Sequence, residues 1–319
     1  MVYIVVLHWN NYRCTDFCLQ YLAQITYTLH KIVVVDNCST DGSFERLKLK
    51  YTSCIYINNS ENLGFARGTN VGLKYAYEQG ADYFILLNND VEVEPDFIEH
   101  LIEPILSLPN VGLVTPKILY RDNREVIWHA GGHIKHSTIT GVSRGYDEFD
   151  IGQYDEIIET QWASGACCLI KRDAINKIGF LEERYFFGQE EWDYSTTAMR
   201  NNFKIIYTHK AVVYHEIAKS TIKSPGLSAY QNIFNKCVYA SKFLSKFQFL
   251  IWVLVYYLYL IFFFPPRNLP HTSYTSFYLR SAKLAALWGI RDFFRGKKIT
   301  ADRIVIINKR LELKYKTND

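Results

Sequence analysis

The first part of the chain alternates apolar runs with segments of helical periodicity, and this alternation restricts the fold more than any other feature. Continuous apolar runs are typical of parallel strands that are buried on both faces. The repeated order of strand, helix and strand predicts an α/β fold with a largely parallel sheet. We expect strands over Val2–Leu7, Ile32–Val35, Ile55–Ile57 and Tyr83–Leu87, and helices over Thr15–Thr28, Ser43–Tyr51 and Gly68–Gln79.

The pattern continues less regularly as far as residue 217, with loops and short strands across residues 120–160. A chain of 319 residues can hold one large domain and an appendage. We therefore expect an α/β domain over residues 1–225 and a helical region over residues 226–319. Further helices are expected over Pro95–Ser107, Asp173–Ile178 and Asp193–Asn201, and further strands over Gly165–Lys171 and Ala211–Tyr214.

An apolar segment at residues 247–264 marks the C-terminal region. It carries no charge, which suits either a membrane helix or a buried core helix. A simple span would place a basic flank outside, since Lys246 precedes it and Arg267 follows it. Residues 267–319 hold 12 Lys and Arg against 4 Asp and Glu, in a chain of net charge +4. We therefore expect a re-entrant or in-plane membrane helix, with lipid rather than nucleic acid as the partner of the basic tail.

Two further features favour the cytoplasmic face of the membrane, with peripheral or monotopic attachment. The chain has seven cysteines without paired Cys-x-x-Cys spacing, which is typical of a reducing compartment. The apolar run Val2–Leu7 is too short for a signal peptide, and it has no basic segment before it.

Polar side chains follow two of the expected strands. Asp36 ends the second strand, and Asn88-Asn89-Asp90 follows the fourth. In α/β sheets, ligands bind beyond the carboxyl ends of the strands. A carboxylate there can accept a hydrogen bond from a nucleobase or a ribose hydroxyl, although an Asp at a strand end can also be only a turn residue.

The glycine-rich segment Asn62–Gly72 leads into an expected helix. Glycines let backbone amides approach a phosphate, and a helix N-terminus favours an anion. Arg67 could pair with a diphosphate. Glycine-rich turns are also common where no ligand binds.

Asn88 and Asp90 could hold Mg²⁺ or Mn²⁺ through an amide and a carboxylate oxygen, with phosphates filling the other positions. His215, which ends a later apolar run, could complete this site, although a single His is more often structural. The alternative interpretation of the Asn-Asn-Asp cluster is a turn or a helix cap.

The acids Glu190, Glu191 and Asp193 crowd into four positions. Clustered carboxylates repel one another, which raises a pKa towards the range of a general base. The alternative is a charged helix start, since acids suit the first turn of a helix.

Taken together, these motifs resemble glycosyltransferase family 2, whose members are inverting enzymes of the GT-A fold. The resemblance is closest to rhamnosyltransferase-like members that build bacterial surface polysaccharides, and it covers roughly residues 2–217. The motifs occur in the family's order, and they read VVLHWNN, VVVDNCSTDGS, NLGFARGTNVG, LLNND, ASGACCLIKRDA, FFGQEEWDYS and VVYHE.

The resemblance implies a role for each matching position. Asp36 would bind the nucleobase, in a pocket lined by the backbone near His8 and Asn10. Glu191 would be the catalytic base, supported by Glu190 and Asp193. The nucleotide sugar would also be bound by Asn62, Gly64, Arg67, Asn88 and Asn89, and the metal by Asp90, Asn88 and His215.

Two positions depart from the family pattern. Asn88 stands where the family usually has the first Asp of its metal motif, which puts the metal site in doubt. Glu191 replaces the usual Asp and is one methylene longer, so Glu190 remains an alternative base.

The implied reaction is the transfer of a hexose, such as rhamnose, from a dTDP- or UDP-sugar to a saccharide or lipid-linked saccharide, with Mn²⁺ or Mg²⁺. A catalytically inactive module that binds nucleotide or carbohydrate at a membrane is the main alternative. A nucleotidyltransferase is disfavoured, because the first strand leads into His8-Trp9-Asn10-Asn11 instead of a basic, glycine-rich phosphate loop.

Overall fold

The computed structural model describes residues 1–216, 225–262 and 273–315, which form two compact units. We call the first the sheet unit; it comprises Met1–His136, Thr140–Glu182 and Glu190–Lys219. We call the second the helical unit; it comprises Ser137–Ile139, Glu183–Gln189 and Ser220–Asp319. Within the described residues all seven cysteines are free thiols.

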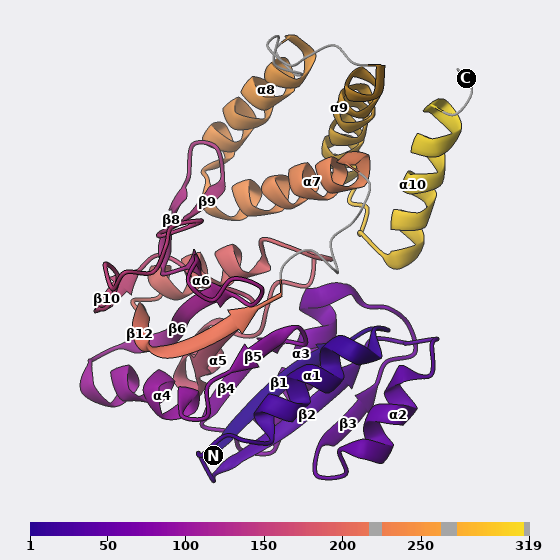
Figure 1. Ribbon diagram of the computed structural model, residues 1–319. Helices are drawn as coiled ribbons and strands as arrows, with labels where there is room; N and C mark the ends of the chain where they lie inside the picture. Colours follow the sequence, from indigo (N-terminus) through magenta and orange to yellow (C-terminus); the bar gives the residue numbers. More distant parts are fainter. Residues whose placement is uncertain (217–224, 263–272, 316–319) are drawn as a thin grey trace. The chain divides into compact units, whose positions relative to one another are not determined.

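The sheet unit is built on a ten-stranded sheet within the described residues (Figure 1). The main order is β10-β12-β6-β11-β4-β1-β2-β3, with β5 paired to β12 and β7 paired to β6. Strands β3, β2, β1 and β4 are mutually parallel, as are β6 and β12, whereas β11 runs antiparallel between β4 and β6. The expected mixed, mainly parallel α/β fold is confirmed.

The strands have the following bounds: β1 (Val2–His8), β2 (His30–Asp36), β3 (Ile55–Asn58), β4 (Tyr83–Asn88), β5 (Val91–Val93), β6 (Val111–Tyr120), β7 (Ile127–His129), β8 (Gly132–Lys135), β9 (Thr140–Ser143), β10 (Ile157–Thr160), β11 (Cys167–Lys171) and β12 (Lys204–His215). Strands β8 and β9 form a separate two-stranded ribbon.

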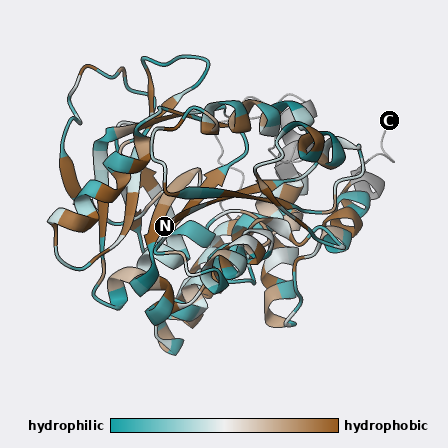
Figure 2. Ribbon diagram, turned by 90° about the horizontal axis from the view of Figure 1, so that it is seen from below, coloured by the Kyte–Doolittle hydropathy of each residue, from teal (hydrophilic) through white to brown (hydrophobic). Residues whose placement is uncertain are grey.

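Helices cover both faces of the central strands, which explains why β1 is apolar throughout. Ile4 and Val6 belong to a core cluster that also contains residues of α1 and α4. Val5 points to the opposite face, where it lies against α3 at Gly72. Figure 2 shows hydrophobic colouring along strands and mixed colouring around helices. The helices of this unit are α1 (Tyr12–Leu22), α2 (Ser43–Lys50), α3 (Gly64–Glu78), α4 (Phe97–Ser107), α5 (Arg172–Ile178) and α6 (Glu190–Arg200).

The helical unit contains α7 (Pro225–Phe243), α8 (Lys246–Phe262), α9 (Ser273–Phe294) and α10 (Ala301–Tyr315). Its core includes a buried ion pair between Asp292 and Arg303, and the hydroxyl of Tyr230 donates to Asp292 at 2.9 Å. Burial raises the pKa of Asp292, but the hydrogen bonds from Arg303 and Tyr230 outweigh it and lower that pKa. Lys236 donates to the carbonyl of Thr138, which joins α7 to the short segment Ser137–Ile139.

The helix starts and two strands differ from the sequence-based expectations. Helix α1 begins at Tyr12 because the Asn11 side chain caps it, accepting from the Cys14 amide. Helix α3 begins at Gly64, and α6 begins at Glu190. Strands β5 and β6 were not expected.

The apolar segment expected over residues 247–264 forms most of α8, and Phe263, Phe264 and Arg267 lie outside the described residues. Among the helices of the described ranges, none combines the length and the apolar character needed to cross a membrane.

Candidate active site

The strand register brings the predicted polar residues to one edge of the sheet. His8 and Asp36 pair across β1 and β2, and β4 ends beside them at Asn88. Strand β12 points the same way as β4 through β6 and β11, and it ends at His215, which pairs with Val91 of β5. The carboxyl edge of the sheet therefore carries His8, Asp36, Asn88, Asp90 and His215, where open α/β sheets bind ligands.

His8 is fully buried and works as a structural link at this edge. Its Nδ1 lies 2.7 Å from the hydroxyl of Thr15, and its Nε2 lies 2.7 Å from that of Ser43. Ser43 donates to Asp41, and Asn89 donates to Thr15, so His8 must donate through Nε2 and accept through Nδ1. Burial lowers the pKa of His8, which agrees with this neutral ring, although Asp36 and Asp41 raise it. Both nitrogens of the imidazole are thus used in hydrogen bonds within the fold, so only the backbone around His8 can face a ligand.

Asp36 is buried and shapes the loop that follows β2. One carboxylate oxygen accepts from the amide of Ser39 at 3.0 Å, and the other accepts from the Ser39 hydroxyl. The Ser39 hydroxyl in turn accepts from the amide of Asn10, whose side chain accepts from the amide of Thr40. Each carboxylate oxygen still has a further acceptor position for a nucleobase N–H.

Asn37 is a buried residue of this loop that the sequence analysis did not single out. Its side chain donates to Asn62 at 2.9 Å and to the carbonyl of Gly64 at 3.0 Å. Its amide oxygen accepts from Asn59 and from the amide of Leu63. Asn37 therefore fixes the segment that leads into α3, and Asn62 is held within the same network.

The glycines of α3 serve packing more than phosphate approach. A Cβ atom at Gly72 would lie 2.5 Å from Val5 Cγ1 and 2.9 Å from Val35 Cγ2. A Cβ atom at Gly68 would lie 2.8 Å from Leu7 Cδ1. The absence of a Cβ at these two glycines therefore lets α3 lie close to the sheet, and phosphate binding at the segment before them stays a prediction.

Gly64 and Arg67 lie in the first turn of α3. Gly64 has φ of 79°, a conformation that favours glycine at the start of this helix. Arg67 is partly exposed, and its guanidinium lies 3.8 Å from Glu61, a loose surface pair. The position at a helix N-terminus leaves Arg67 suited to an anion.

Asp90 and His215 meet because β5 pairs with β12. His215 Nε2 lies 3.1 Å from Asp90 Oδ1, and both side chains are at most 10% exposed. The ring of His215 also packs edge-on against Trp128, with centroids 4.8 Å apart. The sequence prediction that these two residues lie together agrees with this arrangement.

The residues present fit a divalent cation only in part. Oδ1 of Asn88 is a buried oxygen that accepts no hydrogen bond among the described residues, and Oδ1 of Asp90 accepts none beyond its contact with Nε2 of His215. Unsatisfied oxygens of this kind suit Mg²⁺ or Mn²⁺. The described ranges contain no group of three or more His, Cys, Asp or Glu residues that could hold a metal ion. A cation here would therefore need oxygens from a bound phosphate.

The three acids begin α6, where the helix dipole favours negative charge. Glu190 is 4% exposed and Asp193 is 1% exposed, whereas Glu191 is half-buried. The hydroxyl of Thr197 donates to the backbone carbonyl of Asp193 at 2.8 Å and lies 3.4 Å from its carboxylate. A Cβ atom at Gly165 would lie 3.7 Å from that of Glu191, so a glycine keeps this side of the acid open. Glu191 is therefore the acid of the three that a substrate can best reach.

A chain of aromatic rings joins the acid helix to the metal motif. Trp192 lies against Trp162 at 6.0 Å, and Trp162 against His129 at 4.7 Å. His129 neighbours Trp128 at 6.2 Å, and Trp128 contacts His215. Trp128, His129 and Trp162 lie outside the motifs quoted from the sequence, and no sequence signal indicated that their rings would meet.

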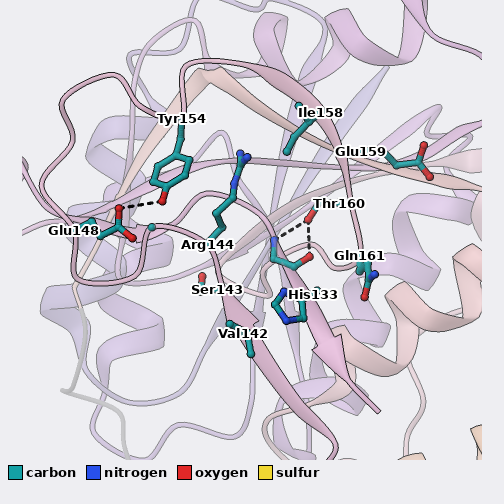
Figure 3. Close-up of a pocket in the computed structure, with 12 residues that line it drawn as sticks. His133, Val142, Ser143, Arg144, Glu148, Tyr154, Ile158, Glu159, Thr160 and Gln161 are labelled. Carbon is teal, nitrogen blue, oxygen red and sulfur yellow. Dashed lines mark hydrogen bonds between the residues drawn. The ribbon is translucent and has the colours of Figure 1, made fainter. Parts of the chain in front are cut away.

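Two hollows share Val142 and Ser143 of β9 in their lining. The first, of about 380 Å³, is the aromatic hollow, lined by Trp128, Gly141, Val142, Ser143, Tyr146 and Trp162. The second, of about 490 Å³, is the polar hollow shown in Figure 3. Its charged groups are largely paired: Arg144 bonds Glu156 at 2.6 Å, and Tyr154 donates to Glu148 at 3.0 Å.

The sequence profile of the family described as "Glycosyl transferase family 2" matches residues 3–179 of the chain. This match includes the loop at Asp36, the start of α3 and the Asn88–Asp90 cluster.

Two characterised relatives transfer sugars. The chain is 25% identical to an N-acetylglucosaminyl-diphospho-decaprenol L-rhamnosyltransferase of Mycobacterium tuberculosis over 215 residues, which is 61% of this chain and 69% of that protein. It is 28% identical to a low-salt glycan biosynthesis hexosyltransferase of Haloferax volcanii over 176 residues, which is 55% of each protein.

Solved structures share the fold. GalNAc-T7 with UDP, GalNAc and Mn²⁺ has a TM-score of 0.56 at 16% identity, and the match covers 69% of this chain but only 44% of that one. The mannosyltransferase PcManGT of Pyrobaculum calidifontis with GDP-mannose and Mn²⁺ has a TM-score of 0.52 at 15% identity, covering 99% of this chain and 82% of that one. These likenesses support the GT-A architecture.

Proposed function

Because the chain belongs to glycosyl transferase family 2, we propose that it transfers a hexose, such as rhamnose, from a nucleotide-diphosphate sugar to a saccharide hydroxyl. The acceptor is a saccharide or a lipid-linked saccharide of a cell-surface polysaccharide. The donor is a dTDP- or UDP-sugar. The rhamnosyltransferase and hexosyltransferase relatives support the sugar class and the acceptor class.

The chain's own residues suit a single displacement with inversion. Asp36 and the loop that it shapes receive the nucleobase, and Arg67 at the start of α3 pairs with the diphosphate. Glu191 takes the proton of the acceptor hydroxyl as that oxygen attacks the anomeric carbon. The oxygen attacks from the face opposite the leaving diphosphate, so the configuration inverts and no sugar-enzyme bond forms.

A divalent cation held by Asp90 and Asn88, with His215, would neutralise negative charge on the departing diphosphate. The unsatisfied oxygens of Asn88 and Asp90 support this assignment. Asn89 supports the site indirectly, because its amide bonds Thr15 beneath the same edge of the sheet.

One observation carries the proposal: in a family 2 chain, Asp36, Asn88, Asp90 and His215 meet at the carboxyl edge of the sheet. The test is calorimetric titration of the purified full chain with dTDP, UDP and GDP, with Mn²⁺ and then with a chelator. Tight binding of one nucleotide that the chelator weakens is expected, followed by release of that nucleotide from its sugar conjugate in the presence of acceptor. A folded protein that binds none of the three would overturn the assignment.

A catalytically inactive module is the second candidate, and the single carboxylate of the Asn88-Asn89-Asp90 motif favours it. The two candidates differ in one readout. The module would bind nucleotide without consuming the donor sugar in the presence of any acceptor.

We also propose that the enzyme works at the cytoplasmic face of a membrane, attached as a peripheral or monotopic protein. Helix α8 supports this, since a solvent-exposed apolar stripe runs along it at the i, i+3, i+4 spacing of one helix face. The stripe comprises Phe247, Leu250, Ile251, Leu254, Val255, Leu258, Tyr259 and Phe262, which are 40–73% exposed. Exposed Lys242 and Lys246 precede it and suit anionic headgroups.

A further inference from the structure

We propose that the aromatic hollow is a subsite for a pyranose ring of the substrate, bound by stacking on Trp128 and Tyr146. The inference rests on the proposed transferase function and extends it to a specific surface. The volume of about 380 Å³ is large enough for a single sugar ring with its substituents.

The position of the hollow supports this role. One of its walls is Trp128, whose indole contacts His215, and His215 lies 3.1 Å from Asp90. Another wall is Trp162, which packs edge-on against Trp192, the residue next to Glu191. The walls of the hollow thus contact residues of both the metal motif and the acid helix. In the proposed reaction the diphosphate leaves at the first, and the acceptor loses its proton at the second.

The chemistry of the walls also matches a sugar. One face of a pyranose ring presents apolar C–H groups, which pack against aromatic faces, while its hydroxyls need polar partners at the rim. Tyr146 is 53% exposed, so its ring offers a face that no protein atom covers fully. Trp162 lines the hollow, and its indole N–H is a buried donor with no hydrogen-bond partner in the described residues.

Gly141 keeps the hollow open. A Cβ atom at this position would lie 2.7 Å from the indole of Trp192. Any larger residue would push Trp192 or the β9 strand, and β9 lines the hollow through Gly141, Val142 and Ser143. The glycine therefore sets how closely the ribbon approaches the acid helix.

The polar hollow is less suited to the same ligand. Its arginine is bonded to Glu156 and to the carbonyl of Ala130, and Thr160 bonds Gly132 through both donor and acceptor (Figure 3). The bonds between Thr160 and Gly132 join groups of this hollow to one another, and Nη2 of Arg144 is a buried donor that has no partner in the described residues. The aromatic hollow instead offers aromatic ring faces beside the unpaired indole N–H of Trp162.

The test uses saturation-transfer NMR on the full chain, with methyl glycosides of L-rhamnose, N-acetylglucosamine and galactose as probes. Saturation of the ring C–H protons of at least one glycoside is expected. Tyr146→Ala should lose most of that signal, and Trp128→Phe should weaken it. Phe149→Ala is the matched control, because Phe149 is 64% exposed on the same loop but lines neither hollow.

Competition experiments with the methyl glycoside distinguish whether the bound pyranose ring belongs to the donor or to the acceptor. If the ring is the donor's, the nucleotide sugar displaces the methyl glycoside and the free nucleoside diphosphate does not. If it is the acceptor's, both are without effect, and Tyr146→Ala raises the acceptor KM but not the donor KM.

Either result supports the subsite. No saturation of any probe by the wild-type chain, or equal saturation by all three variants, would overturn it. Calorimetric nucleotide binding, measured on the same samples, separates this failure from a failure of the proposed transferase function.

Discussion

Nε2 of His215 lies 3.1 Å from Oδ1 of Asp90, and strand pairing alone brings them together. His215 pairs with Val91, the neighbour of Asp90, and the amide of Glu216 donates to the Asp90 carbonyl. Oδ1 of Asp90 accepts no hydrogen bond from any other group in the described residues. The carboxylate is therefore held by its backbone and by His215, and it can accept a further ligand.

Asp90→Asn should weaken Mn²⁺-dependent nucleotide binding more than tenfold, since about tenfold is already lost when only an outer-shell group of a metal site is removed. The substitution keeps the size of the side chain but removes its charge. Calorimetry with Mn²⁺ and with chelator measures the change. Asp173→Asn, an exposed acid paired with Lys171, is the control, and unchanged metal dependence in Asp90→Asn would place the cation elsewhere.

Glu191→Gln should lower the transfer rate by about 10²- to 10⁴-fold, the usual contribution of a general base. Nucleotide binding should persist, because the amide preserves the shape of the side chain and Glu191 belongs to α6 instead of the loop that follows Asp36. Glu190→Gln gives the comparison. If Glu190→Gln loses transfer at unchanged stability while Glu191→Gln retains it, the base is Glu190.

The sequence predicts well the buried strands, which are short apolar runs, and the polar residues that follow them. Val2–Leu7 is apolar at every position because α1 and α4 cover one face of β1 and α3 covers the other. The position of Asp36 and Asn88 beyond strands follows from the same runs, since parallel strands end at the same edge.

The sequence does not predict what depends on contacts between distant segments. Trp128, Trp162 and Trp192 lie on three separate segments, and only the packed fold brings their rings together. The glycines of α3 resemble those of a phosphate loop, but Gly72 also lets the helix pack closely against Val5 and Val35 of the sheet. Asn37 gave no signal because its four hydrogen bonds are all made within the loop that it stabilises.

Stability should fall as the pH is lowered from about 6.5. Burial, together with the positive charge of nearby Arg144, lowers the pKa of His129 to about 3. Since the folded pKa lies below the ordinary 6.5, the folded chain binds fewer protons than the unfolded one in this window. The contribution of His129 to stability is therefore fully present above pH 6.5. As the pH falls from 6.5 towards the folded pKa, this residue lowers the free energy of unfolding by up to about 1.4 kcal/mol per pH unit.

Urea unfolding of the wild type and of His129→Phe, at several pH values from 7.5 to 4, measures this effect. The substitution removes the titrating group and keeps a ring against Trp162. The variant should show a shallower loss of unfolding free energy with falling pH. Identical slopes for the two proteins would exclude His129 as a source of acid sensitivity.

Gly72→Ala should destabilise the sheet unit by up to about 2 kcal/mol. The new methyl group would lie 2.5 Å from Val5 Cγ1, and overpacking of this kind costs about 1–3 kcal/mol. Alanine recovers about 1 kcal/mol of helix propensity, which is smaller than the upper end of that cost. Thermal unfolding beside Gly165→Ala, where the nearest atom would be at 3.7 Å, gives the comparison. A stabilised Gly72→Ala would show that α3 can shift away from the sheet.

The double substitution Leu254→Glu and Val255→Glu should abolish binding to anionic membranes. Both side chains are more than half exposed on the apolar stripe of α8, and burying such a side chain contributes about 1.5–3 kcal/mol. The wild-type chain should co-sediment with vesicles of phosphatidylcholine and phosphatidylglycerol. The bound fraction should fall at high salt or when the anionic lipid is left out. Leu49→Glu, at an 81% exposed position of α2, is the control and should sediment normally. Equal sedimentation of the double variant would exclude α8 as the attachment surface.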